Sequence, residues 1–254
     1  MVKKYLSRTY AFLVYLFLYM PIFLLILFSF NDSRYGGRWQ GFTFKWYTEL
    51  FSDGSIMESL YTTIIVAVIA SIISTVIGTI SAIAIHNMSP RKKAILTNLS
   101  YIPMVNPDIV IGISLLSFFS ILNLKLGYIT LILAHITFNI PYVIFAVLPK
   151  LQQLNPNIEE AALDLGATPI QAFFKVILPE IMPGIITGSL LAFTLSLDDF
   201  IVSFFTTGSG VSTLSIKVYS MTKRGISPKI NALSSLMFIA VLALMLLLQL
   251  KKKK

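Results

Sequence analysis

The strongest constraint on this chain is a series of apolar runs that are long enough to cross a membrane. A spanning helix needs about 20 apolar residues to cross the roughly 30 Å hydrocarbon core, and it hydrogen-bonds its own backbone there. Four runs carry no charged residue, and two more are interrupted only by a few acids. The charge-free runs are 11–30, 60–85, 126–149 and 230–250, and the other two are 95–121 and 181–205. The pattern predicts an all-α integral membrane protein with six transmembrane helices.

Composition supports this class and limits the others. Only 12% of the 254 residues are charged and 56% are hydrophobic, whereas soluble domains are about 25% charged. The connections between spans are short, so we expect a single transmembrane domain over residues 1–254. The net charge of +9 is explained by basic residues that flank spans, so it gives no reason to expect nucleic acid as a partner. The chain has no cysteine, which excludes disulfides and thiolate metal sites.

The basic residues also predict an orientation, because cytoplasmic segments are enriched in Lys and Arg. With the N-terminus inside, six spans return the C-terminus to the cytoplasm. Twelve of the 20 basic residues then lie inside: Lys3, Lys4, Arg8, Arg91, Lys92, Lys93, Lys150, Lys175 and Lys251 to Lys254. A cluster outside opposes the rule: Lys217, Lys223, Arg224 and Lys229. This external basic cluster either docks an acidic protein or flanks a surface helix, and the sequence leaves both open.

Residues 155–179 form the one polar island between the apolar runs. Asn155 is a suitable N-cap with Pro156 at the first helical position, and Gly166 suits the left-handed residue after a helix. Thr168 and Pro169 repeat the start signal. The pattern predicts two short helices joined by a tight turn. Each has an apolar face at helical spacing: Ile158, Ala161, Ala162 and Leu165 in the first, and Ile170, Phe173, Phe174 and Ile177 in the second.

This island resembles a known motif. It is similar to the EAA loop of bacterial ABC importer permeases. The matching positions are Glu160-Ala161-Ala162, then Gly166 after three residues, and Val176-x-Leu178-Pro179 after nine more. The resemblance implies a type I ABC importer permease fold, whose cytoplasmic coupling helix docks on a separate ATPase. The docking residues would be Glu160, Ala161, Ala162, Asp164, Leu165 and Gly166. The plainer interpretation is an amphipathic hairpin without a partner.

Three acids interrupt the apolar runs: Asp108 and the adjacent pair Asp198 and Asp199. Pro103 and Pro107, four residues apart just before Asp108, predict a break in that span. Counted from Leu96, Asp108 lies about 12 residues in, roughly 18 Å, and is expected near the midplane. An ionised carboxylate near a bilayer centre costs at least about 2.5 kcal/mol, so such residues usually face a polar pathway. No Lys or Arg lies deep in a span to neutralise them. Neighbouring residues on a helix diverge by about 100°, so at most one of the pair faces a given ligand and the other can serve a helix interface. The plainer alternatives are protonated acids or acids that cap broken helices.

A second resemblance covers nearly the whole chain. The chain resembles the PotC-type permease subunit of spermidine/putrescine importers in six runs of residues: 39–47, 106–110, 196–205, 217–220, 225–228 and 230–233. The family implies a heterodimer with a sister permease, two ATPase subunits and an extracytoplasmic polyamine-binding protein, in the lipid of a bacterial inner membrane. Its substrate pathway would include Asp108, Asp198, Asp199 and Phe200, whose ring can attract a cation. The chain has no G-x4-G-K-[ST] sequence, so ATP and Mg²⁺ are expected on the partner ATPase and no cofactor on this chain.

Three smaller patterns concern packing. Ala70, Ser74, Gly78 and Ala82 form a stripe of small residues, and Gly184 and Gly188 form a G-x-x-x-G pair; both favour close helix contacts. His135, Thr137 and Asn139 are expected to hydrogen-bond between helices. Trp39 and Trp46 are expected at the membrane interface, with a contact to an external partner as the alternative.

The rival functions are a permease for another small solute, such as a metal cation or an anion, a self-sufficient channel or carrier, and a structural scaffold. The absence of an internal six-span repeat counts against a carrier, and a scaffold leaves the acids unexplained.

Overall fold

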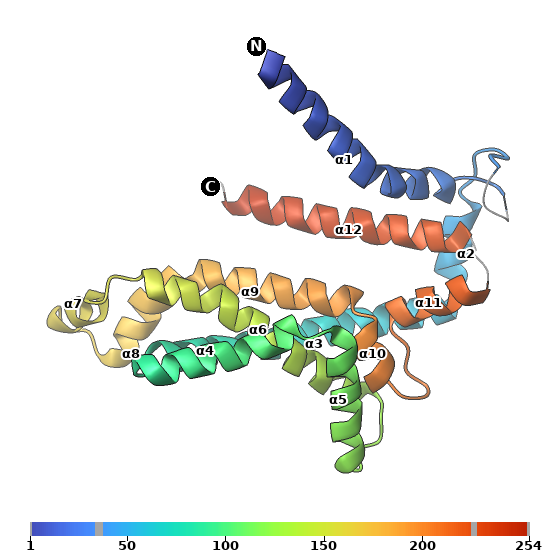
Figure 1. Ribbon diagram of the computed structural model, residues 1–254. Coiled ribbons are helices and arrows are strands. Elements are labelled where there is room, and N and C mark those ends of the chain that lie inside the picture. The colour runs from blue at the N-terminus through green and yellow to red at the C-terminus, as the bar shows by residue number, and fades with distance from the viewer. Residues whose placement is uncertain (1, 34–37, 225–227, 253–254) are drawn as a thin grey trace. The chain divides into compact units, whose positions relative to one another are not determined.

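The computed structural model describes residues 2–33, 38–224 and 228–252, and most of them lie in helices (Figure 1). An isolated antiparallel bridge joins Asn31 and Phe42. The elements, in order, are α1 (Val2–Ser29), α2 (Lys45–Ser52), α3 (Gly54–His86), α4 (Pro90–Val105), α5 (Asp108–Ile121), α6 (Tyr128–Gln153), α7 (Ile158–Asp164), α8 (Pro169–Ala172), the π-helical turn η1 (Phe173–Ile177), α9 (Leu178–Asp198), α10 (Ile201–Thr206), α11 (Leu214–Arg224) and α12 (Pro228–Lys252).

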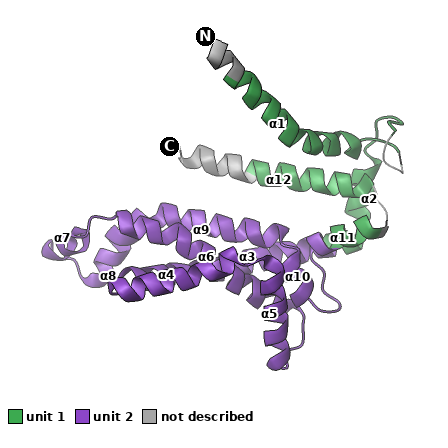
Figure 2. Ribbon diagram, viewed as in Figure 1, with its two compact units in different colours: residues 1–57, 217–254 green, residues 58–216 purple. Residues whose placement is uncertain are grey.

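The chain forms two compact units, which Figure 2 colours separately. Unit 1 comprises residues 1–57 and 217–254, and unit 2 comprises residues 58–216. The predicted single transmembrane domain over residues 1–254 stays a prediction.

Unit 2 is built around α6, which packs against α3 and α9. Its core consists of small and aliphatic side chains from these three helices: Ala82, Ile85, Val143, Ile144, Val147, Leu148, Leu151, Ile181 and Ala192. The predicted small-residue contacts are confirmed. A Cβ added to Gly184 would lie 2.8 Å from the carbonyl oxygen of Ala146, and one added to Gly188 would lie 3.2 Å from Val143 Cα. The G-x-x-x-G pair therefore allows α9 to pack closely against α6 within the chain.

The candidate spans agree with the apolar runs in part. Residues 7–29, 54–86, 128–153 and 169–198 are each long and apolar enough to cross a membrane. The run at 95–121 is a bent pair, because α4 and α5 meet at 102°, and it adds a fifth span if the pair is counted as one. The described apolar part of α12 ends at Ala243 and is shorter. The chain is therefore a multi-pass helical membrane protein with four or five spans by length and composition.

In unit 1, α1 and α2 both pack against α12. Trp46 is buried, and its indole N–H donates to the carbonyl oxygen of Asn31 at 2.7 Å. Trp46 therefore packs inside the unit and does not present its ring to the surroundings, while its expected depth at the membrane interface stays a prediction. Trp39 is exposed, which leaves the interface interpretation open for that residue.

The close approach of α3 to α6 gives a stability prediction. A Cβ at position 78 would lie 2.6 Å from Val143 Cβ, and overpacking of this kind costs about 1–3 kcal/mol. We expect Gly78→Ala to lower the melting temperature of the detergent-purified protein. Gly54→Ala on the same helix meets no atom within 4 Å and is the matched control. Equal melting temperatures for the two variants would contradict this packing.

Candidate functional site

The candidate substrate site lies at the break between α9 and α10. Asp199 ends α9, and its carboxylate accepts hydrogen bonds from the backbone N–H groups of Val202 at 3.3 Å and Ser203 at 2.7 Å. These donors belong to the first turn of α10, where N–H groups have no partner within the helix. Asp199 therefore caps α10. This is the plainer of the two interpretations of the sequence, in which the acid caps a broken helix.

Helix α6 supplies the other contacts to this break. His135 Nε2 lies 3.0 Å from the Ser203 hydroxyl oxygen and 3.7 Å from Asp199 Oδ2. One turn further along α6, the amide nitrogen of Asn139 donates to the Ser196 hydroxyl oxygen at 2.7 Å. Each of these side chains is nearly or fully buried. The expected role of His135 and Asn139 in bonding between helices is confirmed, whereas Thr137 is exposed and bonds only to the Leu133 carbonyl.

Asp198 differs from its neighbour because it is exposed. The Ser215 hydroxyl group donates to the Asp198 backbone oxygen at 3.2 Å, so this contact leaves the carboxylate unoccupied. Phe200 follows the pair and packs against Phe204, with ring centroids 5.6 Å apart. The break thus separates one acid that is used in the fold from one that is available to a ligand.

Asp108 lies at the second break, as the first residue of α5. The predicted interruption of this span is confirmed at Asn106 and Pro107, but Pro103 stays inside α4. Because the chain bends by 102° here, the depth of Asp108 cannot be counted along a straight helix. Asp108 is exposed and interacts electrostatically with Tyr142 of α6.

The two breaks are neighbours because α5 packs against α10. Gly112 allows the approach, since a Cβ there would lie 3.4 Å from the carbonyl oxygen of Ile201 and 2.7 Å from the Phe205 ring. The helix that begins at Asp108 therefore contacts the short helix that begins three residues after Asp198.

The polar island forms a second candidate site, which we call the coupling hairpin (residues 155–179). Figure 1 shows its helices α7 and α8 at one end of unit 2, with α5 and α10 near the opposite end. Gly166 has a left-handed φ of 85°. Thr168 and Gln171 form a reciprocal capping box, with bonds of 3.3 and 3.1 Å. The predicted helix, turn and helix are confirmed.

Two details of the hairpin differ from expectation. The first helix begins at Ile158, because Asn155 instead accepts a bond from the backbone N–H of Asn157 at 3.0 Å. The second detail concerns the positions at apolar spacing, which are not equally buried. The two helices pack through the small residues Ala162 and Ala172, which are buried, whereas Leu165 is 89% exposed.

The hairpin therefore presents apolar and acidic side chains together. Ile170 and Phe174 are 71% and 60% exposed, and Glu160, Ala161, Asp164 and Gly166 are exposed as well. The downstream π-turn at Phe173–Ile177 joins the hairpin directly to α9, and such turns are frequent at functional sites. An exposed apolar surface of this kind is typical of protein contacts.

In unit 1, part of the external basic cluster is already paired. Lys229 Nζ lies 3.3 Å from Glu49 Oε2 and 3.9 Å from Asp53 Oδ2. Burial acts to raise the pKa of Asp53, but hydrogen bonds from Ser55 and Ile56 and the charge of Lys229 hold it below its usual value. Lys229 thus has an internal role, which favours the surface-helix interpretation for this residue. Residues 225–227 lie outside the described residues.

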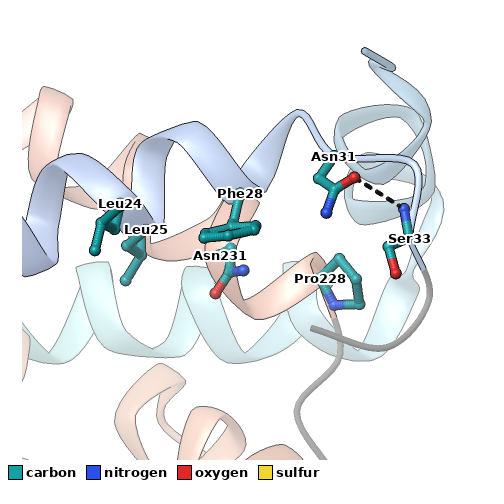
Figure 3. Close-up of a pocket in the computed structure, with 7 residues that line it drawn as sticks. All are labelled: Leu24, Leu25, Phe28, Asn31, Ser33, Pro228 and Asn231. Atoms are coloured by element: carbon teal, nitrogen blue, oxygen red, sulfur yellow. Dashed lines mark hydrogen bonds between the residues drawn. The ribbon is translucent and has the colours of Figure 1, made fainter. Parts of the chain in front are cut away.

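Unit 1 also contains a cavity of about 220 Å³, shown in Figure 3. Its lining is mostly apolar and includes the polar residues Asn31, Ser33 and Asn231. The Asn31 side chain is engaged by the backbone of Arg38 and Gln40, each at 2.8 Å. Because no acid lines this cavity, it does not share the charge of the site in unit 2.

Comparison with known proteins agrees with the resemblance drawn from the motifs. A sequence model of the family described as binding-protein-dependent transport system inner membrane component matches residues 74–250. The chain is 37% identical over 254 residues to the spermidine/putrescine transport system permease protein PotC of Haemophilus influenzae, covering 100% of this chain and 99% of that protein. It is 39% identical over 232 residues to the putrescine transport system permease protein PotI of Escherichia coli, covering 89% and 83%.

A solved structure shows the same fold at low identity. It is the crystal structure of a bacterial ABC transporter involved in the import of the acidic polysaccharide alginate. The match has a TM-score of 0.77 at 16% identity, and it covers 98% of this chain and 95% of that one.

The different surroundings of the paired acids give a prediction. Asp199→Ala removes the acceptor of two backbone N–H groups, and loss of a cap costs about 0.5–2 kcal/mol. We expect this variant to melt at a lower temperature in detergent, whereas Asp198→Ala should leave the melting temperature unchanged. The reverse ranking would contradict the assignment of Asp199 as the cap.

Proposed function

Because the chain belongs to the family of binding-protein-dependent transport system inner membrane components, we propose that it is the permease subunit of an ATP-driven importer for polyamines such as spermidine and putrescine. It is a transport component rather than an enzyme. The observation that carries the substrate class is the pair of exposed acids, Asp108 and Asp198, at two adjacent helix breaks. Ionised carboxylates bind amines through charge-assisted hydrogen bonds, and no Lys or Arg lies in these spans to oppose them.

The aromatic side chains near the breaks fit the same passenger. Phe200 lies beside the acids, and Tyr142 lies close enough to Asp108 to interact with its charge. Aromatic faces attract cations by about 0.5–2 kcal/mol, and their carbon surface suits the methylene chain of a polyamine. The names of the relatives PotC and PotI support this cargo.

We place six transmembrane helices in a bacterial inner membrane, with both termini in the cytoplasm. The four clear spans, the bent pair α4 and α5, and α12 make up the six. This arrangement puts the coupling hairpin on the cytoplasmic side, where ATP is present, and it agrees with the bias of the basic residues.

The coupling hairpin is proposed to dock on a separate ATPase through the exposed residues Glu160, Ala161, Asp164, Leu165 and Gly166. Ala162, the remaining residue of the predicted set, is buried and would support the docking surface from beneath. Leu165 supports such a contact, because no residue within the chain covers most of this large apolar side chain, which is 89% exposed. Two ATPase subunits would hold the ATP and Mg²⁺, and this chain would bind no cofactor. The remaining partners would be a sister permease that completes the pathway and an extracytoplasmic polyamine-binding protein.

A permease for a different small solute is the second candidate. The negative charge at the breaks disfavours an anion, while a metal cation would share the preference for carboxylates. Competition between the two cargoes separates these possibilities.

The function is tested by co-purifying the chain with its neighbouring subunits and measuring radiolabelled spermidine and putrescine uptake into vesicles. We expect ATP-dependent uptake that unlabelled polyamine suppresses and divalent metal ions do not. Asp108→Asn and Asp198→Asn should each reduce uptake strongly, while basal ATP hydrolysis persists because the hairpin is intact. Uptake that metal ions suppress would favour the second candidate, and uptake by the chain alone without ATP would contradict an importer subunit.

The coupling role is tested by reversing one charge on the hairpin. Glu160→Lys should abolish substrate-stimulated ATP hydrolysis and uptake while the protein still inserts. Glu180→Lys, an exposed acid in the first turn of α9, is the matched control and should retain both activities. Gly166→Pro should behave like Glu160→Lys, because proline cannot adopt the positive φ at this turn. Normal stimulated hydrolysis in these hairpin variants would argue against docking.

A further inference from the structure

At the α9–α10 break, the side chain that caps α10 also contacts a buried residue from a different helix, which a helix cap alone does not require. The Asp199 side chain is only 7% exposed and that of His135 only 1%. Asp199 is already bonded to the backbone of α10, yet it also faces a histidine from α6, 64 positions away in the sequence. A histidine is an expensive residue to bury at this point, since its Nδ1 atom has no hydrogen-bond partner among the described residues.

The geometry gives the histidine a definite function at the break. Its Nε2 atom lies 3.0 Å from the Ser203 hydroxyl oxygen, within hydrogen-bond distance, and 3.7 Å from Asp199 Oδ2, a longer electrostatic contact. The backbone N–H of the same Ser203 donates to Asp199 Oδ2 at 2.7 Å, so the imidazole contacts both ends of this capping bond. His135 therefore ties α6 to the first turn of α10 at the same place where Asp199 caps it.

We propose that His135 is a positioning residue of the substrate pathway, which holds Asp199 in its capping role so that the neighbouring Asp198 remains exposed to the passenger. The inference rests on the proposed polyamine permease function, because it gives the exposed acid a ligand. His135 itself is buried and does not touch the passenger. Its effect passes through the capped first turn of α10 and the helix break at residues 199 and 200.

Without the imidazole, the Ser203 hydroxyl group and the Asp199 carboxylate both lose their contact with α6, and only the two N–H groups of α10 hold the carboxylate. The first turn of α10 then loosens, and Asp198 no longer has a fixed position. The expected consequence is weaker substrate recognition rather than loss of ATP hydrolysis, because the coupling hairpin lies at the other end of unit 2 (Figure 1).

The test uses the complete importer complex with three substitutions. His135→Leu removes the ring nitrogens and keeps a similar volume, while His135→Gln restores hydrogen-bonding atoms near the position of Nε2. Thr62→Val is the control, because it removes a different hydrogen bond between the buried Thr62 and α6, the 2.9 Å part-buried contact between the Thr62 and Tyr128 hydroxyl groups. We expect His135→Leu to raise the KM for polyamine uptake about tenfold, the size expected for a lost buried hydrogen bond, with basal ATP hydrolysis unchanged. His135→Gln should recover most of the affinity, and Thr62→Val should leave KM unchanged.

A second measurement reports on the break without any substrate. The chain contains no cysteine, so Val202→Cys introduces a single thiol at a fully buried position of α10. This thiol should resist a water-soluble maleimide when His135 or Gln is present at position 135, and it should react several-fold faster in the His135→Leu background. The same protection in both backgrounds would overturn the proposal, as would equal KM shifts for His135→Leu and Thr62→Val. If the unmodified complex takes up no polyamine, the proposed function fails, while the labelling result still decides whether His135 holds the break.

Discussion

The close packing of α6 between α3 and α9 is the contact on which unit 2 depends. Gly78, Gly184 and Gly188 let the helix backbones approach to distances at which any larger side chain would clash. In a membrane, apolar side chains gain little by leaving lipid for protein, so association relies on close van der Waals contact and hydrogen bonds between helices. The glycines supply the first, and the buried bonds from His135 and Asn139 of α6 supply the second.

This arrangement makes α9 a rigid connection between the two candidate sites. It joins the π-turn of the coupling hairpin to the acid-bearing break through 21 residues, which is about 30 Å at 1.5 Å per residue. That length equals the thickness of the hydrocarbon core. Under the proposed coupling role, a displacement of the hairpin would pass along α9 to the break without an intervening loop.

Local sequence predicted the features that local chemistry decides. Gly166, Thr168 and Pro169 carry the turn and the second helix of the hairpin in their own backbone preferences, and Pro107 predicted the interruption of the third span. The 102° bend was not predictable, because its angle depends on how α5 packs against α10 through Gly112. Nor was the burial of Ala162 and Ala172, since helical spacing shows which residues share a face but not which of them another helix of the chain covers.

Asp198 is exposed whereas Asp199 caps a helix, and this difference illustrates why a fold does not specify a cargo. An importer of an acidic polysaccharide shares this fold at 16% identity, so the framework itself is compatible with passengers of opposite charge. The sequence showed that two adjacent carboxylates diverge, and the hydrogen bonds from Val202 and Ser203 show that Asp199 is the one used inside the protein. Under the proposed function, Asp199 is taken up by the cap of α10, and the charge offered to a passenger comes from Asp198 and Asp108. Selectivity would then depend on buried partners that keep one acid in the fold as much as on the acids that remain exposed.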